Sequence, residues 1–284
     1  MTQQDLTDYT PDDGDSSTAQ YVPDTCIGFD VTADFAHFRK VGNNSAKPSY
    51  RVPPRTTITG LLAGIMGMPR DSYYDLFSPS SSAVAVVPKK LPHTYTMGIT
   101  TVNTNEAAIQ YLPLEKDWRD GAEMLTPESY LERWDKPGRQ DLVETPRQRD
   151  TYEMLVDPVY RVYISLANEG VHDELRERLE DSRYHYSPAL GLSECIADIR
   201  NVDTHTVKPA TTDAVDSATY DDSTVIPRPG VTVKRERAPL CMEATDGGRR
   251  TTAFGNITYA TGDDRLPVDA SRAHAIGDHE VILY

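Results

Sequence analysis

The stretch SYRVPPRTTITGLLAGIMG, residues 49–67, predicts more about the fold than any other part of this sequence. Two prolines and a pair of threonines lead into an apolar segment that contains spaced glycines. Its large apolar residues recur at i, i+3, i+4, i+7 and i+8, the spacing of one helix face: Ile58, Leu61, Leu62, Ile65 and Met66. The segment is therefore predicted to be a short amphipathic helix with one buried face.

The same stretch also indicates how this helix begins, packs and ends. Thr56 or Thr57 is the expected N-cap, because a threonine hydroxyl can accept a hydrogen bond from a free amide of the first turn. Gly60 and Gly64 lie four residues apart and predict a close approach to a neighbouring element. The helix is expected to end at Gly67.

Patterns on both sides of the helix predict four strands and a second helix. Apolar and polar residues alternate at 26–35, which is typical of a half-buried strand. The further strands are expected at 83–90, 159–166 and 193–202, and the second helix at 171–181. Strand, helix, strand occurs twice in this order, which predicts an α+β, ferredoxin-like βαββαβ domain of the kind found in RNA-recognition domains.

The remaining segments suggest the domain organisation. The ferredoxin-like domain is expected at 25–202, with a long polar insertion at about 95–157. It is preceded by an acidic disordered tail, residues 1–24, and followed by an acidic loop, residues 203–224. Residues 225–284 contain strand-like runs and are expected to form a small β-rich C-terminal region.

Composition argues against several classes of protein. No segment has the roughly 18 consecutive apolar residues of a membrane span, and the acidic N-terminus is unlike a signal peptide, so a cytoplasmic protein without a membrane partner is expected. The three cysteines form no CxxC pair and are typical of buried thiols. The sequence has no HExxH, no glycine-rich nucleotide loop and no GxSxG motif, so no metal and no cofactor is predicted.

The charge is distributed unevenly along the chain. The net charge is −15, and only 8 of the 29 basic residues are lysine, a balance that suggests adaptation to a high-salt cytoplasm. Residues 39–90 nevertheless carry eight bases against two acids. The bases are Arg39, Lys40, Lys47, Arg51, Arg55, Arg70, Lys89 and Lys90. This basic segment is a candidate anion-binding surface, and the alternative is chance clustering of solvated side chains.

The start of the helix offers the most specific binding hypothesis. A helix N-terminus presents free amides and a partial positive charge, which together favour a phosphate. Arg51 and Arg55 flank this terminus, and Tyr50 is placed to stack on a base. The alternative is that the prolines and threonines only shape the turn into the helix, and both interpretations can hold together.

A catalytic alternative can be assembled from Tyr50, Lys89 or Lys90, and His93. Metal-independent RNA cleavage needs one group that activates the 2′-hydroxyl and another that protonates or stabilises the leaving oxygen. Side chains of this kind at a strand end more often contact phosphate or water, so binding is the better supported reading.

Three motifs carry a family resemblance. They are FRKVGNNSAKPSYRVPPRTTITGLLAGIMG at 38–67, TPRQRDTYEMLVDPVYRVYISL at 145–166 and SPALGLSECIADI at 187–199. In content and order they resemble the Cas5 subunits of type I CRISPR–Cas surveillance (Cascade) complexes. The sequence looks closest to the type I-B branch, in a halophilic version.

The resemblance implies a ferredoxin-like domain of the RAMP superfamily in an antiviral defence complex. Such a subunit caps the 5′ handle of the CRISPR RNA without cutting it, and its insertion forms a thumb-like element. It also contacts the backbone subunit Cas7 and the large subunit Cas8. The implied RNA-binding residues are Arg39, Lys40, Lys47, Tyr50, Arg51, Arg55, Thr56, Thr57, Lys89 and Lys90, with Arg147 and Arg149 in or beside the thumb.

The resemblance also bears on catalysis. In the type I-C branch, Cas5 cuts precursor RNA with tyrosine, lysine and histidine side chains. Tyr50 matches that tyrosine, but two residues separate Lys90 from His93, which departs from the adjacent pair of that branch. Because a separate Cas6 ribonuclease cuts RNA in the type I-B branch, no catalysis is predicted, and a metal-independent endoribonuclease is the alternative. A third reading is an acidic interaction protein with no RNA role.

Overall fold

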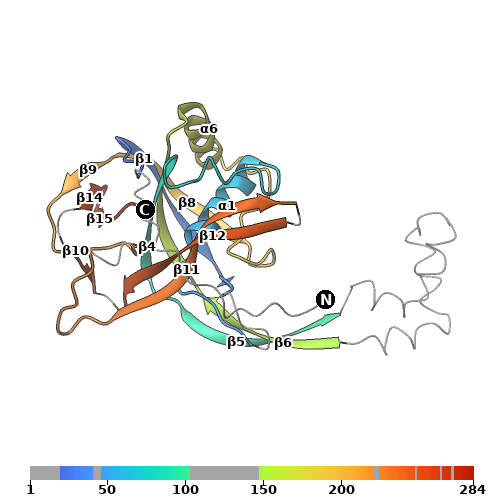
Figure 1. Cartoon of the computed structure of the whole chain (residues 1–284). Coiled ribbons are helices and arrows are strands. Elements are labelled where there is room, and N and C mark those ends of the chain that lie inside the picture. The colour runs from blue at the N-terminus through green and yellow to red at the C-terminus, as the bar shows by residue number, and fades with distance from the viewer. Residues whose placement is uncertain are drawn as a thin grey trace, which may run out of the picture.

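The structure, a computed structural model, describes residues 20–40, 46–102, 147–220, 224–246, 248–262, 264–269 and 272–284. At its centre is an antiparallel sheet of four strands in the order β4-β7-β1-β8 (Figure 1). These strands are β1 (Thr25–Ala33), β4 (Ser82–Lys90), β7 (Val159–Leu166) and β8 (Ala197–Thr206). Helix α1 (Arg55–Met66) lies between β1 and β4 in sequence, and α6 (Glu169–Glu180) lies between β7 and β8.

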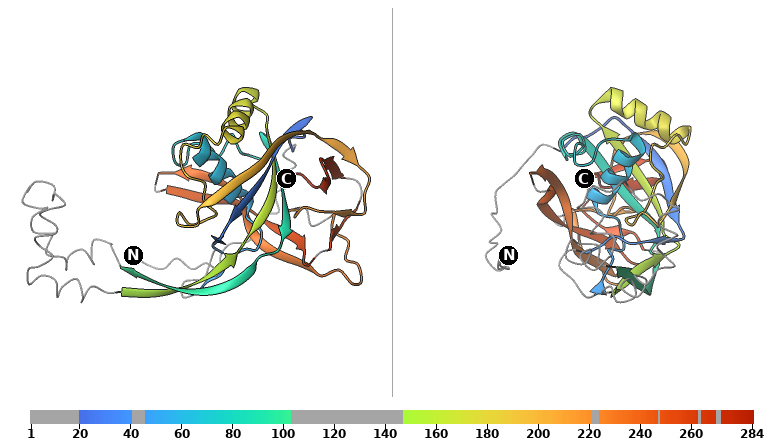
Figure 2. Two further views of the ribbon diagram at one scale, coloured as in Figure 1. Left: turned by 180° about the vertical axis from the view of Figure 1, so that it is seen from behind. Right: turned by 90° about the vertical axis from the view of Figure 1, so that its right-hand side faces the viewer.

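Both helices cover the same face of this sheet (Figures 1 and 2). The apolar stripe predicted for the first helix is confirmed, because its side chains pack into the core with those of β1. The side chains that meet there and are 0% exposed are Ile27, Phe29 and Val31 of β1, and Ile58, Leu62 and Ile65 of α1. Leu175 and Leu179 of α6 complete this layer.

The opposite face of the sheet is also covered. The C-terminal strands β14 (Ala273–Ile276) and β15 (His279–Val281) lie on that side, where Ile276 and Val281 pack with Cys26, Ala83 and Tyr163. The strand predicted at 26–35 forms as β1, but the prediction that only one of its faces is buried is wrong, because side chains on both faces are buried. Strands covered on both faces read as continuous apolar runs, as the sequence AVAVV at the centre of β4 does.

The ends of α1 agree only in part with the prediction. Gly67 ends the helix in the left-handed conformation, with φ 74°, as expected. The helix begins before both threonines, and its N-cap is Pro54, whose carbonyl accepts the amides of Thr57 and Ile58 at 2.9 and 3.2 Å. The threonine N-cap is therefore wrong. The predicted close approach is also wrong at Gly64, where an added Cβ would meet nothing within 4 Å.

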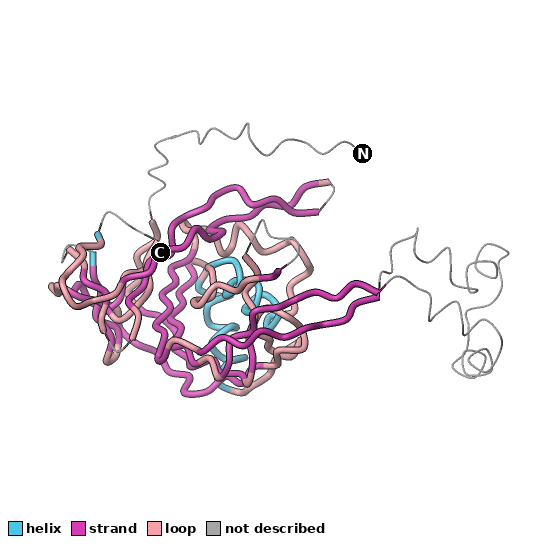
Figure 3. The backbone as a smooth tube through the Cα atoms, turned by 90° about the horizontal axis from the view of Figure 1, so that it is seen from below, coloured by secondary structure: helices cyan, strands magenta, loops and turns pink. Residues whose placement is uncertain are grey.

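The insertion begins and ends as regular structure. Strands β5 (His93–Val102) and β6 (Arg147–Val156) pair antiparallel along their whole length and extend away from the central sheet (Figures 1 and 3). Short strands β2 (Phe35–Ala36) and β3 (Ala46–Lys47) add to β6. Residues 103–146, the middle of the predicted insertion, lie outside the described residues.

The expected acidic loop at 203–224 needs correction, because β8 starts later than predicted and runs to residue 206. Arg161 of β7 neutralises this end of β8: it donates to the carboxylate of Asp203 and, at 2.6 Å, to the carbonyl of Asn201. Gly28 of the intervening strand leaves space for the guanidinium, since a Cβ there would lie 2.5 Å from it. Acidic residues with a buried counter-charge can thus stay in the sheet.

The rest of the C-terminal part is strand-rich, as predicted for 225–284. It contains β11 (Val233–Thr245), β12 (Gly248–Ala260) and β13 (Leu266–Pro267), and β9 (Lys208–Ala210) and β10 (Ala214–Val215) precede them. β11 and β12 form a long hairpin, and β11 packs against α1. The predicted tail lies outside the described residues except for 20–24, where Tyr21 donates its amide to the carbonyl of Pro79 at 3.0 Å. In the described part of the chain, no helix is long and apolar enough to cross a membrane.

Candidate nucleic-acid interface

Arg55, at the first turn of α1, is a buried residue of the core. It is 1% exposed. Its guanidinium donates to the carbonyls of Phe77 and Ser82 at 3.1 and 3.0 Å, to the Ser82 hydroxyl at 2.6 Å, and to the carbonyl of Tyr284. A guanidinium used in this way is not available to a phosphate. The prediction of Arg55 as an RNA-binding residue is therefore wrong, because its charge is needed to satisfy buried carbonyls.

Tyr50 is also buried, at 3% exposed. Its ring belongs to the core, and its hydroxyl donates to the carbonyl of Arg237 on β11 at 2.7 Å. The ring therefore cannot stack on a base in this conformation, and the hydroxyl cannot act on an RNA. Tyr50 is therefore unavailable to the trio of Tyr50, a lysine and His93 proposed for cleavage, whereas His93 is exposed at the start of β5.

The start of α1 is closed to an anion. The amide of Arg55 donates to the hydroxyl of Tyr220 at 3.1 Å, and Pro54 accepts the amides of Thr57 and Ile58. Burial strongly raises the pKa of Tyr220, so this phenol stays protonated. The predicted phosphate site at the helix N-terminus is therefore wrong: protein groups already accept these hydrogen bonds. Thr56 and Thr57 are half-buried beside it.

Most of the other predicted residues lie along the β5–β6 hairpin or on the segments that adjoin it. Lys47 of β3 reaches β6, where its ammonium donates to Asp150 at 2.5 Å and to the hydroxyl of Tyr152 at 3.0 Å. The hydrogen bond with Asp150 raises the pKa of Lys47, so the amine stays charged. Arg51 donates to the carbonyl of Pro92, just before β5, at 2.7 Å.

Exposed cations lie on the neighbouring strands. Lys90 is exposed at the end of β4, which leads directly into β5, and Arg149 is exposed on β6. Lys89 is also exposed, but its ammonium lies 3.9 Å from the carboxylate of Asp30 on β1. Arg39 is exposed and forms a bridge with Ser49 in the strand pairing. The name basic surface is used below for six of these cations: Arg39, Lys40, Lys47, Arg51, Lys90 and Arg149. Arg147 begins β6, and its side chain lies outside the described part.

The basic surface continues onto β11, which the sequence reasoning did not include. Lys40 forms an ion pair with Glu236, and the next residue, Arg237, accepts the hydrogen bond of Tyr50. The sequence KRER at 234–237 was a visible signal, since three of its four residues are basic. Its place beside the basic segment could not be predicted, because no pattern in the neighbouring sequence shows that β11 packs against α1.

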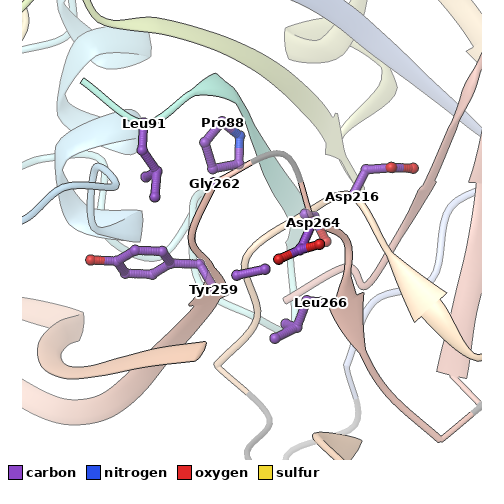
Figure 4. Close-up of a pocket in the computed structure, with 9 residues that line it drawn as sticks. Pro88, Leu91, Asp216, Tyr259, Gly262, Asp264 and Leu266 are labelled. Carbon is purple, nitrogen blue, oxygen red and sulfur yellow. The ribbon is translucent and has the colours of Figure 1, made fainter. Parts of the chain in front are cut away.

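No group of metal ligands accompanies this surface in the residues that the structure describes. Among them, no three His, Cys, Asp or Glu side chains lie close enough to hold an ion together. A pocket of about 30 Å³ lies between the end of β4 and the C-terminal strands (Figure 4). Its polar lining includes Asp216 and Asp264, and its volume is that of about two water molecules. Because the pocket is small and lined by carboxylates, it does not fit a nucleotide phosphate.

Comparison with known proteins gives one family match and several distant structural ones. The family model described as "CRISPR-associated protein (Cas_Cas5)" matches residues 26–252, well over half of the 284 residues. No curated protein gives a significant match to this sequence.

The similar solved structures share little sequence with this chain. A chain of a "CRISPR RNA-guided surveillance complex" is 16% identical with a TM-score of 0.48, over 84% of this chain and 91% of the other. A CRISPR protein from Archaeoglobus fulgidus is 15% identical with a TM-score of 0.39, over 90% and 97%. A chain of a type III-B Cmr-beta complex bound to cognate target RNA is 12% identical with a TM-score of 0.40, over 85% and 86%. At these values the likeness does not by itself assign an activity.

Proposed function

The chain belongs to the CRISPR-associated Cas5 family, and on this premise we propose that it is a non-catalytic, RNA-binding subunit of a CRISPR surveillance complex. The proposed ligand is the 5′ handle of the CRISPR RNA. One observation carries the proposal: a chain of net charge −15 places six cationic side chains along the projecting β5–β6 hairpin and on the segments that adjoin it. Two of the six, Lys40 and Lys47, are paired with Glu236 and Asp150.

The contacts of the basic surface support a binding role. Lys47 and Arg51 are held in place by hydrogen bonds to β6 and to the segment before β5. Arg39, Lys90 and Arg149 remain exposed beside them. A surface with both positioned and exposed cations suits a phosphate backbone, whose charges recur at short intervals.

The finer assignments belong to the same proposal. The central sheet with its two helices is proposed to be the ferredoxin-like core, because strand, helix, strand occurs twice and the strand order is β4-β7-β1-β8. The β5–β6 hairpin is proposed to be the stem of the thumb-like insertion that meets Cas7, and the type I-B assignment, the contact with Cas8 and the halophilic host are proposed with it. At high salt, phosphate attraction is screened within about 3 Å, so direct hydrogen bonds and stacking would carry more of the affinity.

The first test removes two exposed cations. The double variant Arg39→Gln/Arg149→Gln breaks no hydrogen bond or ion pair described above for either residue. It is expected to weaken binding of RNA copied from the host's CRISPR repeats by about tenfold. The slope of log affinity against log salt concentration is expected to decrease by the equivalent of up to about two phosphate contacts. The measurement is a binding titration at several salt concentrations.

The control is Arg183→Gln/Arg200→Gln, which changes the net charge equally at residues whose side chains are 60% and 67% exposed elsewhere on the molecule. Equal losses in both variants would show only an effect of net charge and would contradict the assigned surface. The same titrations report on catalysis. Specific cleavage of the repeat RNA that is lost in His93→Ala would replace the proposal with the endoribonuclease reading.

A further inference from the structure

The long hairpin of β11 and β12 carries an exposed aromatic ring under an arginine. Phe254 of β12 is 38% exposed, and the guanidinium carbon of Arg237 on β11 lies 4.8 Å from the centre of its ring. Phe254 pairs with Pro239, so Arg237 is its diagonal neighbour across the two strands. Among the described residues, Arg237 forms no ion pair with a carboxylate.

The two faces of this hairpin differ in character. The inner face packs against the body through Ala238, Ile257 and Tyr259, which are at most 1% exposed. Because side chains alternate along a strand, Arg235 and Arg237 lie on the outer face, where both are exposed. Core packing therefore does not explain the Arg237–Phe254 pair.

The pair is also fixed in place beside the basic surface. The carbonyl of Arg237 accepts the hydroxyl of Tyr50 at 2.7 Å, and its neighbour Glu236 forms the ion pair with Lys40. Glu236 in addition accepts the hydroxyl of Tyr259 at 2.8 Å. These contacts hold this part of β11 against the loop that precedes α1. Lys40 of the basic surface thus meets the inner face of the hairpin, and the Arg237–Phe254 pair lies on the opposite face of the same two strands.

We propose that Phe254 and Arg237 form a stacking platform for a base of single-stranded RNA. This inference rests on the proposed RNA-binding function. An exposed ring and a planar guanidinium each present a flat face to a base, and every base can stack on them. A phosphate beside the stacked base would meet Arg235, which is exposed on the same face two residues before Arg237. Stacking is not screened by salt as charge attraction is, so the platform suits binding in a high-salt cytoplasm.

The experiment compares single variants of the full chain in titrations with single-stranded repeat RNA at low and high salt. Phe254→Ala is expected to weaken binding about tenfold at both salt concentrations, and Phe254→Tyr to restore it. Arg237→Gln is expected to weaken binding more at low salt than at high salt. Tyr186→Ala removes another exposed aromatic ring, 62% exposed and in the loop after α6, and is expected to have no effect.

A second measurement locates the base. RNA that contains 5-iodouridine is irradiated in the complex, and the attached peptide is identified by mass spectrometry. Attachment within β12 is expected, and it is lost in Phe254→Ala. Thermal unfolding of each variant shows whether the hairpin remains folded.

The outcomes separate this inference from the proposed function. If the wild-type chain binds no RNA, the proposed function and the platform both fail. If the wild-type chain binds RNA and Phe254→Ala binds equally well, only the platform fails. Binding of an acidic peptide at the hairpin in preference to RNA would also overturn it.

Discussion

At the scale of single residues, Arg55 shows how a cation from the basic segment became part of the core. Its guanidinium joins three parts of the chain: the start of α1, the turn before β4 and Tyr284, which is 229 residues away in sequence. Buried carbonyls that lose their donor cost about 1–3 kcal/mol each. The residue therefore stabilises the fold at the place where the last strand region meets β4.

Substitution of Arg55 tests this role. Arg55→Met keeps much of the side-chain volume but removes the guanidinium that donates to the carbonyls of Phe77, Ser82 and Tyr284, of which Tyr284 keeps the amide of Val84 as a donor. The free energy of unfolding is expected to fall by about 3–5 kcal/mol. Urea denaturation measures the change. RNA affinity per folded molecule is expected to stay at the wild-type value. A stable Arg55→Met protein with lost RNA binding would return Arg55 to the interface.

At the scale of elements, Gly64 inside α1 and Gly67 at its C-cap differ in whether the structure requires glycine. Gly67 ends the helix with φ 74°, and an added Cβ would lie 2.6 Å from the ring of His185. Gly64 lies inside the helix, and its added Cβ would meet open space. Conformation and contact therefore require glycine at Gly67, whereas neither requires it at Gly64.

Alanine at each position makes a matched test on the same helix. Gly67→Ala is expected to lower the free energy of unfolding by about 1–3 kcal/mol, because the left-handed conformation and the contact with His185 both oppose a Cβ. Gly64→Ala is expected to raise it by about 0.5–1 kcal/mol through helix propensity. Chemical denaturation of the two variants beside the wild type gives both values. Destabilisation by Gly64→Ala would indicate that this face of α1 packs against something else.

At the scale of the whole molecule, several histidines are packed in places where water is scarce. Burial is the main cause of a pKa below the usual value of 6.5 at four histidines: His37, His172, His274 and His279. Each therefore favours its neutral form in the folded state. His279, for example, lies 2.7 Å from the hydroxyl of Tyr163 on the sheet face that β15 covers.

Stability is therefore expected to depend on pH between neutrality and mild acid. The unfolded chain takes up protons at these histidines near pH 6.5, whereas the folded protein takes them up only at lower pH. The stabilising contribution is thus complete above pH 6.5 and is lost as the pH falls through the folded-state values. Urea denaturation at pH 7.5, 6.5 and 5.5 measures the slope, and His279→Gln should reduce it. An unchanged slope in that variant would show that His279 does not contribute.

Much of the central sheet could be predicted from local sequence. The period of two at 26–35 and the i, i+3, i+4 spacing at 58–66 depend only on neighbours in the chain, and these segments form β1 and α1 as expected. The arms of the β5–β6 hairpin could not be recognised in this way. His93 pairs with Val156, so each arm is a strand only because of a partner far along the chain.

The sequence by itself determined where helices, strands and positive charge occur, because these properties are local to a stretch of chain. The tertiary structure alone decided which cations face water. Arg55 and Tyr50 are drawn into the core by Tyr284 and by Arg237 of β11, whereas Arg149 stays exposed on the hairpin. Burial is a property of the contacts between distant segments, and no pattern within residues 49–67 records those contacts.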